Sequence, residues 1–250
     1  MPSAPSPPEP GAEHRGTHAL APFGYPIVGI PVGWLILFFL FADLMLAFPQ
    51  IDQAVAALFY TDGIGFRAQG ALWEQMLYRS VGVLMVVGNL GLIAIWAVNR
   101  WGGCRLLDLT GRKLVLLLCL LALLPGLLVN QVFKEHWGRA RPVQVSAFGG
   151  DRPFTPAFIP SPSSGGSFSS GHVAAAAYLI AVAHLLGGPR CPWVVLAAFY
   201  TALVGLARMA AGGHFVSDVV TSVFLVLFGY MMLRHLLCPD ADDARPAASR

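Results

Sequence analysis

Six long apolar runs, separated by polar stretches, dominate the chain. They cover residues 27–48, 81–98, 114–133, 173–188, 191–207 and 215–237. About 20 apolar residues are needed for a helix to cross a bilayer, and most of the runs are close to that length. We therefore expect an all-α integral membrane bundle of six transmembrane helices over residues 23–238. The flanking stretches, 1–22 and 239–250, are polar or rich in Pro and Ala, and we expect both to be disordered tails, the first of them cytoplasmic.

Composition supports this fold class and excludes others. The chain is 56% hydrophobic and 12% charged, whereas a soluble domain carries about 25% charged residues. Its arginines are scattered and have no interleaved aromatic motif, so we expect no nucleic-acid partner, and no feature implies a soluble protein partner. The four cysteines show no CxxC pairing, which favours free thiols.

Loop charge predicts the orientation in the membrane. The loop between the second and third runs has one acid, Asp108, against four basic residues: Arg100, Arg105, Arg112 and Lys113. Such loops face the cytoplasm, so both termini lie on that side and the loops after the first, third and fifth runs lie opposite. The loop after the third run is also basic, against this rule, but its charges have a separate explanation as part of a binding site.

The junction of the last two runs concentrates ionisable residues. Arg208, His214 and Asp218 lie within one stretch of eleven residues at a membrane boundary. Charged side chains are costly there. On a helix, His214 and Asp218 would share a face and hydrogen-bond, which would leave the other imidazole nitrogen free as a base or nucleophile. A capping role with a structural Arg–Asp pair is the simpler alternative.

Two more clusters fall on the same membrane face. Lys134 and Arg141 begin the loop after the third run and suit an anion, although lipid-headgroup contacts would also explain them. Between them, Arg139 is placed for a local ion pair with Glu135. The same loop ends in a Ser-Gly-His sequence, Ser170 to His172, at a helix start, which suits either an anion site or a plain N-cap.

Together the three clusters resemble the type 2 phosphatidic acid phosphatase (PAP2) superfamily. Its motifs K-x6-R-P, P-S-G-H and S-R-x5-H-x3-D are similar to residues 134–142, 169–172 and 207–218, except that Ser169 stands for proline and Ala207 for serine. The resemblance implies a metal-independent phosphatase that needs no cofactor. It implies that His214 attacks phosphorus, that Asp218 orients it and that His172 protonates the leaving oxygen. The phosphoryl oxygens would be held by the remaining motif residues: Lys134, Arg141, Arg208, Ser170 and Gly171.

The substrate is suggested by a weaker resemblance. Residues 51–66 and the aromatic connection 143–169 are similar to bacterial lipid A phosphatases of this superfamily, the 4′-phosphatase type in particular. That resemblance implies a lipid substrate in the bacterial inner membrane, with the active site facing the periplasm. We expect the aromatic connection to lie over a lipid headgroup. Alternatives are undecaprenyl diphosphate or phosphatidylglycerophosphate as substrate, and a non-catalytic anion-binding membrane protein.

Overall fold

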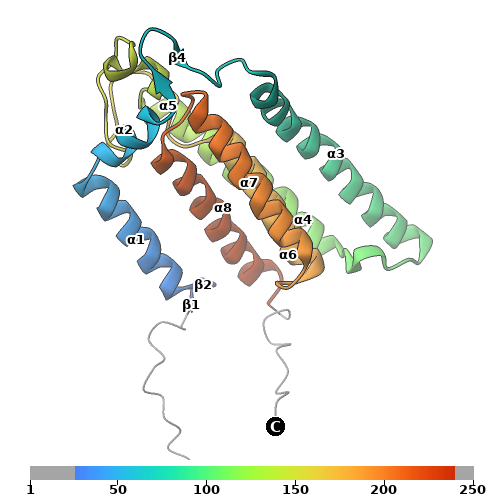
Figure 1. Ribbon diagram of the computed structural model, residues 1–250. Coiled ribbons are helices and arrows are strands. Elements are labelled where there is room, and N and C mark those ends of the chain that lie inside the picture. Colours follow the sequence, from blue (N-terminus) through green and yellow to red (C-terminus); the bar gives the residue numbers. More distant parts are fainter. Residues whose placement is uncertain (1–25, 240–250) are drawn as a thin grey trace, which may run out of the picture.

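The structure, a computed structural model, describes residues 26–239. The predicted tails therefore lie outside the described residues, apart from Pro239. The described part is a helical bundle with its helices side by side (Figure 1), as the apolar runs predict. In chain order the main helices are α1 Val32–Ala47, α2 Gln50–Ala57, α3 Leu72–Gly102, α4 Gly111–Leu121, η2 Ala122–Phe133, α5 Lys134–His136, α6 Gly171–Gly187, α7 Pro192–Ala210 and α8 Val216–Leu237.

Short elements complete the chain. Two antiparallel hairpins of two-residue strands lie at the ends of the bundle, β1 Pro26–Ile27 with β2 Ile30–Pro31 and β3 Tyr60–Thr61 with β4 Gly65–Phe66. Three 3-10 turns, η1 Leu106–Asp108, η3 Pro142–Gln144 and η4 Ser146–Phe148, lie in the loops. No closed sheet forms among residues 26–239, so the structure confirms the all-α fold class.

Within residues 26–239, four helical segments are long and apolar enough to cross a membrane: α3, the continuous segment Gly111–His136, α7 and α8. The pair α1 and α2 passes the same test together, but it is bent by 83°. Helix α6 has only 17 residues, which at about 1.5 Å per residue spans about 26 Å of a hydrocarbon core about 30 Å thick. The multi-pass bundle is thus established, and the count of six crossings stays a prediction.

Two boundaries differ from the expected ones. The first run begins as the β1–β2 hairpin rather than as helix, because Gly29 has a φ of 81° and prolines occupy both outer strand positions. The second run extends to 31 residues in α3 and continues beyond both ends of its charge-free segment. That extension brings Glu74 and Tyr78, which lie outside the expected span, onto the first turns of a membrane helix.

Helix α6 is the centre of the bundle. Its alanines Ala174, Ala177 and Ala181 are fully buried against α4 and α8, since small side chains allow helices to approach closely where lipid provides no hydrophobic driving force. Polar pairs between helices add to the packing: Tyr178 donates to Asn89 across 2.7 Å. The outward faces of α1 and α3 carry exposed apolar side chains, as lipid-facing surfaces do.

A cap of loops and short helices covers one end of the bundle, around α2, α5 and β4 in Figure 1. Its core contains Phe66, Phe148 and Phe215 together with small apolar residues. Phe168 is also buried, and Phe158 packs on Phe168 and on aromatic rings of α1. The aromatic connection 143–169 is therefore largely packed inward. Two of its phenylalanines, Phe148 and Phe168, are buried within the protein, and the expected place of the connection over a lipid headgroup stays a prediction.

Candidate functional site

The three sequence clusters meet under this cap. Lys134 begins α5, Arg141 follows in the loop, Ser170 caps α6, and Gly171 and His172 form the first turn of α6. Arg208 is in the last turn of α7, His214 lies in the loop 211–215, and Asp218 is in the first turn of α8. The positive charges of Lys134, Arg141 and Arg208 lie close enough to act electrostatically on both His172 and His214. The structure thus brings the predicted residues together at one end of the bundle.

The position of His214 is set by the loop 211–215 folding back on α7. The backbone N–H groups of Gly213 and His214 both donate to the Arg208 carbonyl oxygen, at 2.9 and 3.3 Å. His214 is buried, and its Nδ1 lies 2.6 Å from the carbonyl oxygen of Ser167. Because a carbonyl only accepts, Nδ1 must carry the proton, and Nε2 is left with its lone pair available.

The electrostatic setting keeps this imidazole neutral. Burial lowers the pKa of His214 well below its usual value, and the charges of Arg208, Arg141 and Lys134 lower it further. The Ser167 carbonyl opposes this shift only in part. A neutral, buried and oriented imidazole that has a free nitrogen and lies near three cations is suited to attack an electrophile that carries negative oxygens.

The predicted bond between His214 and Asp218 does not form. The Asp218 Oδ2 atom is 3.9 Å from His214 Nδ1, beyond hydrogen-bond distance. The reason is local: α8 begins only after its N-cap Phe215, so His214 precedes the helix and the four-residue spacing does not place both on one helical face. Asp218 accepts from the Phe215 backbone N–H at 2.9 Å and from the Ser167 hydroxyl at 2.6 Å. Asp218 is therefore linked to His214 through Ser167 rather than directly.

Arg139, which the sequence analysis placed in a local ion pair with Glu135, is instead at the centre of a buried network. Its Nη1 donates to Asp218 at 2.5 Å and to the Ser217 hydroxyl at 2.9 Å, and its Nη2 donates to Asp52 at 2.7 Å. Its Nε donates to the Thr155 carbonyl at 2.8 Å. Arg139 and both carboxylates are at most 1% exposed. One guanidinium thus joins α2, the connection 143–169 and the start of α8.

Asp52 completes this network from α2. Its Oδ1 accepts from the Ser217 backbone N–H at 3.0 Å and its Oδ2 accepts from the Ser217 hydroxyl at 2.5 Å. The first N–H groups of a helix have no partner within the helix, so a carboxylate placed there stabilises the first turn of α8. Asp52 was not identified as a site residue from the sequence, although it lies in the stretch 51–66 that resembles lipid A phosphatases.

Lys134 and the start of α6 pack tightly together. The Lys134 Nζ donates to Asn130 at 2.5 Å. A Cβ at Gly171 would lie 2.5 Å from Asn130 Oδ1 and 3.1 Å from Lys134 Nζ, so any larger residue there would displace these two side chains. The N-cap Ser170 has a buried hydroxyl without a hydrogen-bond partner among the described residues, while its backbone N–H donates to Ser222 at 2.8 Å. Its hydroxyl is available to a ligand, which a plain N-cap would not leave free.

The first turns of α3 form the remaining wall. Glu74 accepts from Arg208 Nη1 at 2.9 Å. The ring of Tyr78 stacks on His172 with 4.0 Å between centroids, and the Arg208 guanidinium lies 5.0 Å from the same ring. A cavity of about 400 Å³ lies beside these residues and is also lined by Arg141. Neither Glu74 nor Tyr78 was identified from the sequence, because their motif partners lie more than 90 residues away.

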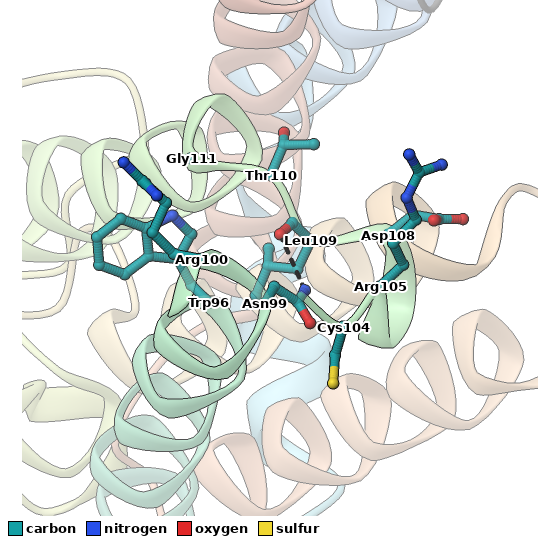
Figure 2. Close-up of a pocket in the computed structure, with 9 residues that line it drawn as sticks. All are labelled: Trp96, Asn99, Arg100, Cys104, Arg105, Asp108, Leu109, Thr110 and Gly111. Atoms are coloured by element: carbon teal, nitrogen blue, oxygen red, sulfur yellow. Dashed lines mark hydrogen bonds between the residues drawn. The ribbon is translucent and has the colours of Figure 1, made fainter. Parts of the chain in front are cut away.

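A separate cavity of about 380 Å³ lies at the opposite end of the bundle, between α3 and the start of α4 (Figure 2). Asn99 closes its floor by donating to the Leu109 carbonyl oxygen at 3.2 Å. The guanidinium groups of Arg100 and Arg105 point apart in Figure 2 and do not converge on one position. This cavity contains none of the motif residues, so the candidate site is the one under the cap.

Comparison with known proteins finds a family and several similar chains. The model of the PAP2 superfamily matches residues 113–238. The chain is 33% identical over 221 residues to a lipid A 4′-phosphatase of Francisella tularensis subsp. novicida, covering 81% of this chain and 91% of the relative. It is 32% identical over 192 residues to a lipid A 4′-phosphatase of Rhizobium leguminosarum, covering 70% and 82%. No solved structure matches the chain significantly.

Proposed function

The chain belongs to the PAP2 superfamily and is a membrane lipid phosphatase, and we propose that it removes the 4′-phosphate of lipid A through a phosphohistidine intermediate. The substrate is supported by the names of its relatives and by their coverage of most of the chain. The mechanism rests on one observation above all: His214 donates through Nδ1 to the Ser167 carbonyl, so its free Nε2 belongs to a neutral, fixed imidazole surrounded by cations.

In the first step, His214 Nε2 attacks phosphorus. The N–P bond forms while the bond between phosphorus and the sugar oxygen breaks. The imidazole gains positive charge as it reacts, and the Ser167 carbonyl on Nδ1–H stabilises that charge. Ser167 is itself held by Asp218, so the Arg139 network supports the nucleophile from behind.

Three cations take the place that metal ions occupy in many phosphoryl-transfer enzymes. Phosphoryl transfer depends on positioning and on neutralising charge spread over the equatorial oxygens. Lys134, Arg141 and Arg208 supply that charge from three different segments. The unpaired Ser170 hydroxyl and the first N–H groups of α6 supply further donors, since a helix start favours anions.

His172 is the proposed acid. It lies in the first turn of α6, next to the donors for phosphate, and Tyr78 holds its ring by stacking. Burial and the charges of Arg208, Lys134 and Arg141 lower the pKa of His172 to about 4. The negative phosphate of the substrate offsets these charges, so His172 takes up a proton when the substrate binds and gives it to the leaving sugar oxygen. Water then attacks phosphorus, His172 takes the water proton, and the N–P bond breaks to release phosphate and regenerate His214.

We propose that the site faces the periplasm of a bacterial inner membrane. The basic loop between α3 and α4 lies at the opposite end of the bundle from the site in Figure 1. Placing that loop in the cytoplasm by the excess of basic residues puts the site on the other face. Cysteine labelling from outside intact cells, after substitution at Ser146 in the cap, would test this orientation.

The deciding experiment measures phosphate release by detergent-purified protein from lipid A, undecaprenyl diphosphate, phosphatidylglycerophosphate and phosphatidic acid. We expect release from lipid A, with mass spectrometry locating the loss at the 4′ position. The His214→Ala variant should release none. His136→Ala is the matched control, because His136 is exposed at the same end of the bundle. Release from another lipid but not from lipid A would refute the substrate. Anion binding without release from any lipid would favour the non-catalytic alternative.

A further inference from the structure

The cavity beside Arg208 has a part that the phosphate does not need. On one side it is lined by Arg141 and Arg208, which hold phosphoryl oxygens in the proposed mechanism. On the other side it is lined by the turn before α3 and the first turns of α3, including Gln69, Gln75 and Arg79. Its volume, about 400 Å³, falls within the range of about 300–1,000 Å³ typical of small-molecule sites.

The two sides are rigidly connected. Glu74 holds the Arg208 guanidinium by an ion pair of 2.9 Å, and both groups are about nine-tenths buried. Tyr78 lines the cavity, and the same ring stacks on His172. A ligand whose phosphate is bound by Arg208 therefore has its adjoining group beside α3, next to the proposed acid.

The side chains on the α3 wall suit hydroxyl groups. A glutamine amide has an NH₂ group that donates and a carbonyl oxygen that accepts, so it can bind a sugar hydroxyl in either direction. The Gln75 amide is already positioned, because its Nε2 donates to the Gly70 carbonyl at 2.9 Å and its Oε1 accepts from Arg79 Nη2 at 3.5 Å, which leaves its second N–H for a ligand hydroxyl. Gly70 has a φ of 79°, which turns the chain so that Gln69 and Gln75 line the same cavity.

We propose that this cavity is the subsite for the sugar ring that bears the scissile phosphate, with Gln69 and Gln75 as its hydroxyl-binding residues. The inference rests on the proposed function and extends it, because it explains how a phosphosugar is distinguished from a phosphate on a glycerol or polyprenyl group. Glu74 acts as a positioning residue that keeps Arg208 at the boundary between the phosphate and the sugar.

The first test is direct binding. The full-length His214→Ala protein in detergent is titrated calorimetrically with glucosamine 4-phosphate and with inorganic phosphate. We expect glucosamine 4-phosphate to bind at least fivefold tighter, about the gain from one or two net hydrogen bonds. Adding Gln69→Ala should remove most of that difference, whereas adding Gln131→Ala should not, because Gln131 is an exposed glutamine that does not line the cavity.

The second test is kinetic and uses the protein with His214 intact. We expect Gln69→Ala to raise KM for lipid A about fivefold with little change in kcat, and to leave KM for phosphatidic acid unchanged. Gln75→Ala should act in the same direction, with thermal unfolding measured beside it because Gln75 also holds Gly70.

The outcomes separate this inference from the proposed substrate. Hydrolysis of lipid A with no effect of either glutamine, or equal affinity for glucosamine 4-phosphate and inorganic phosphate, would overturn the sugar subsite and leave the phosphatase standing. Failure to hydrolyse lipid A, together with phosphosugar binding that depends on Gln69, would refute the substrate and support the subsite.

Discussion

Replacing Arg139 by lysine should destabilise the protein and inactivate it, although the charge is kept. The guanidinium binds Asp52 through Nη2 and Asp218 through Nη1, and both carboxylates are at most 1% exposed. A lysine ammonium is a single point charge, which cannot reproduce a fork that reaches two carboxylates. At least one buried carboxylate then loses its partner, which costs about 3–5 kcal/mol.

The consequence for activity follows from the same contacts. Asp218 holds the Ser167 hydroxyl at 2.6 Å, and the Ser167 carbonyl orients His214 at 2.6 Å. When Asp218 shifts, Ser167 and the nucleophile shift with it, and displacements of about 1 Å can reduce a rate 100-fold. We expect kcat to fall by about that factor while KM changes little, since the phosphate-binding cations are untouched.

The assay pairs thermal unfolding in detergent with phosphate release. Arg67→Lys is the matched control, because Arg67 is exposed at the same end of the bundle. The double variant Arg139→Lys/Asp52→Asn should recover part of the stability, because only one buried carboxylate then needs a cation. An Arg139→Lys protein with the unfolding temperature and kcat of the unaltered protein would refute the network as the support of His214.

Four further outcomes are expected. Glu74→Gln should raise KM about tenfold, because a charge-assisted hydrogen bond worth about 1.5–3 kcal/mol no longer holds Arg208; unchanged KM in steady-state kinetics would contradict this. Gly171→Ala should abolish activity with the fold retained by circular dichroism, because its methyl group would displace Asn130 and the lysine bound to it. The lowered pKa of His214 keeps it neutral in the folded protein below pH ~6.5, where it protonates in the unfolded chain. The folded protein should therefore lose stability as pH falls below ~6.5. The decrease of kcat/KM at acid pH that reports protonation of His214 should lie below that pH, and a decrease that begins above it would refute the lowered pKa. Phosphate release should persist in EDTA, and complete loss with rescue by Mg²⁺ would contradict a cradle of three cations.

Much of the molecule follows from local patterns along the chain. The apolar runs alone predict a multi-pass helical bundle, because crossing lipid requires every backbone hydrogen bond to be made within a helix. No apolar run lies between Lys134 and His172, and two lie between His172 and His214. Two crossings return the chain to the same side, so all three residues are predicted to lie on one membrane face. The structure places them together under the cap, as expected.

The partners of the acids, in contrast, were decided only by tertiary structure. Whether Asp218 meets His214 depends on where α8 begins, and Phe215 as N-cap leaves His214 outside the helix. Asp218 binds Arg139 instead, 79 residues away, and Asp52 binds Ser217 across 165 residues. No periodicity encodes such pairs. They exist because the cap buries four charged and polar groups together, and burial without water requires each to find whichever partner the fold brings within reach.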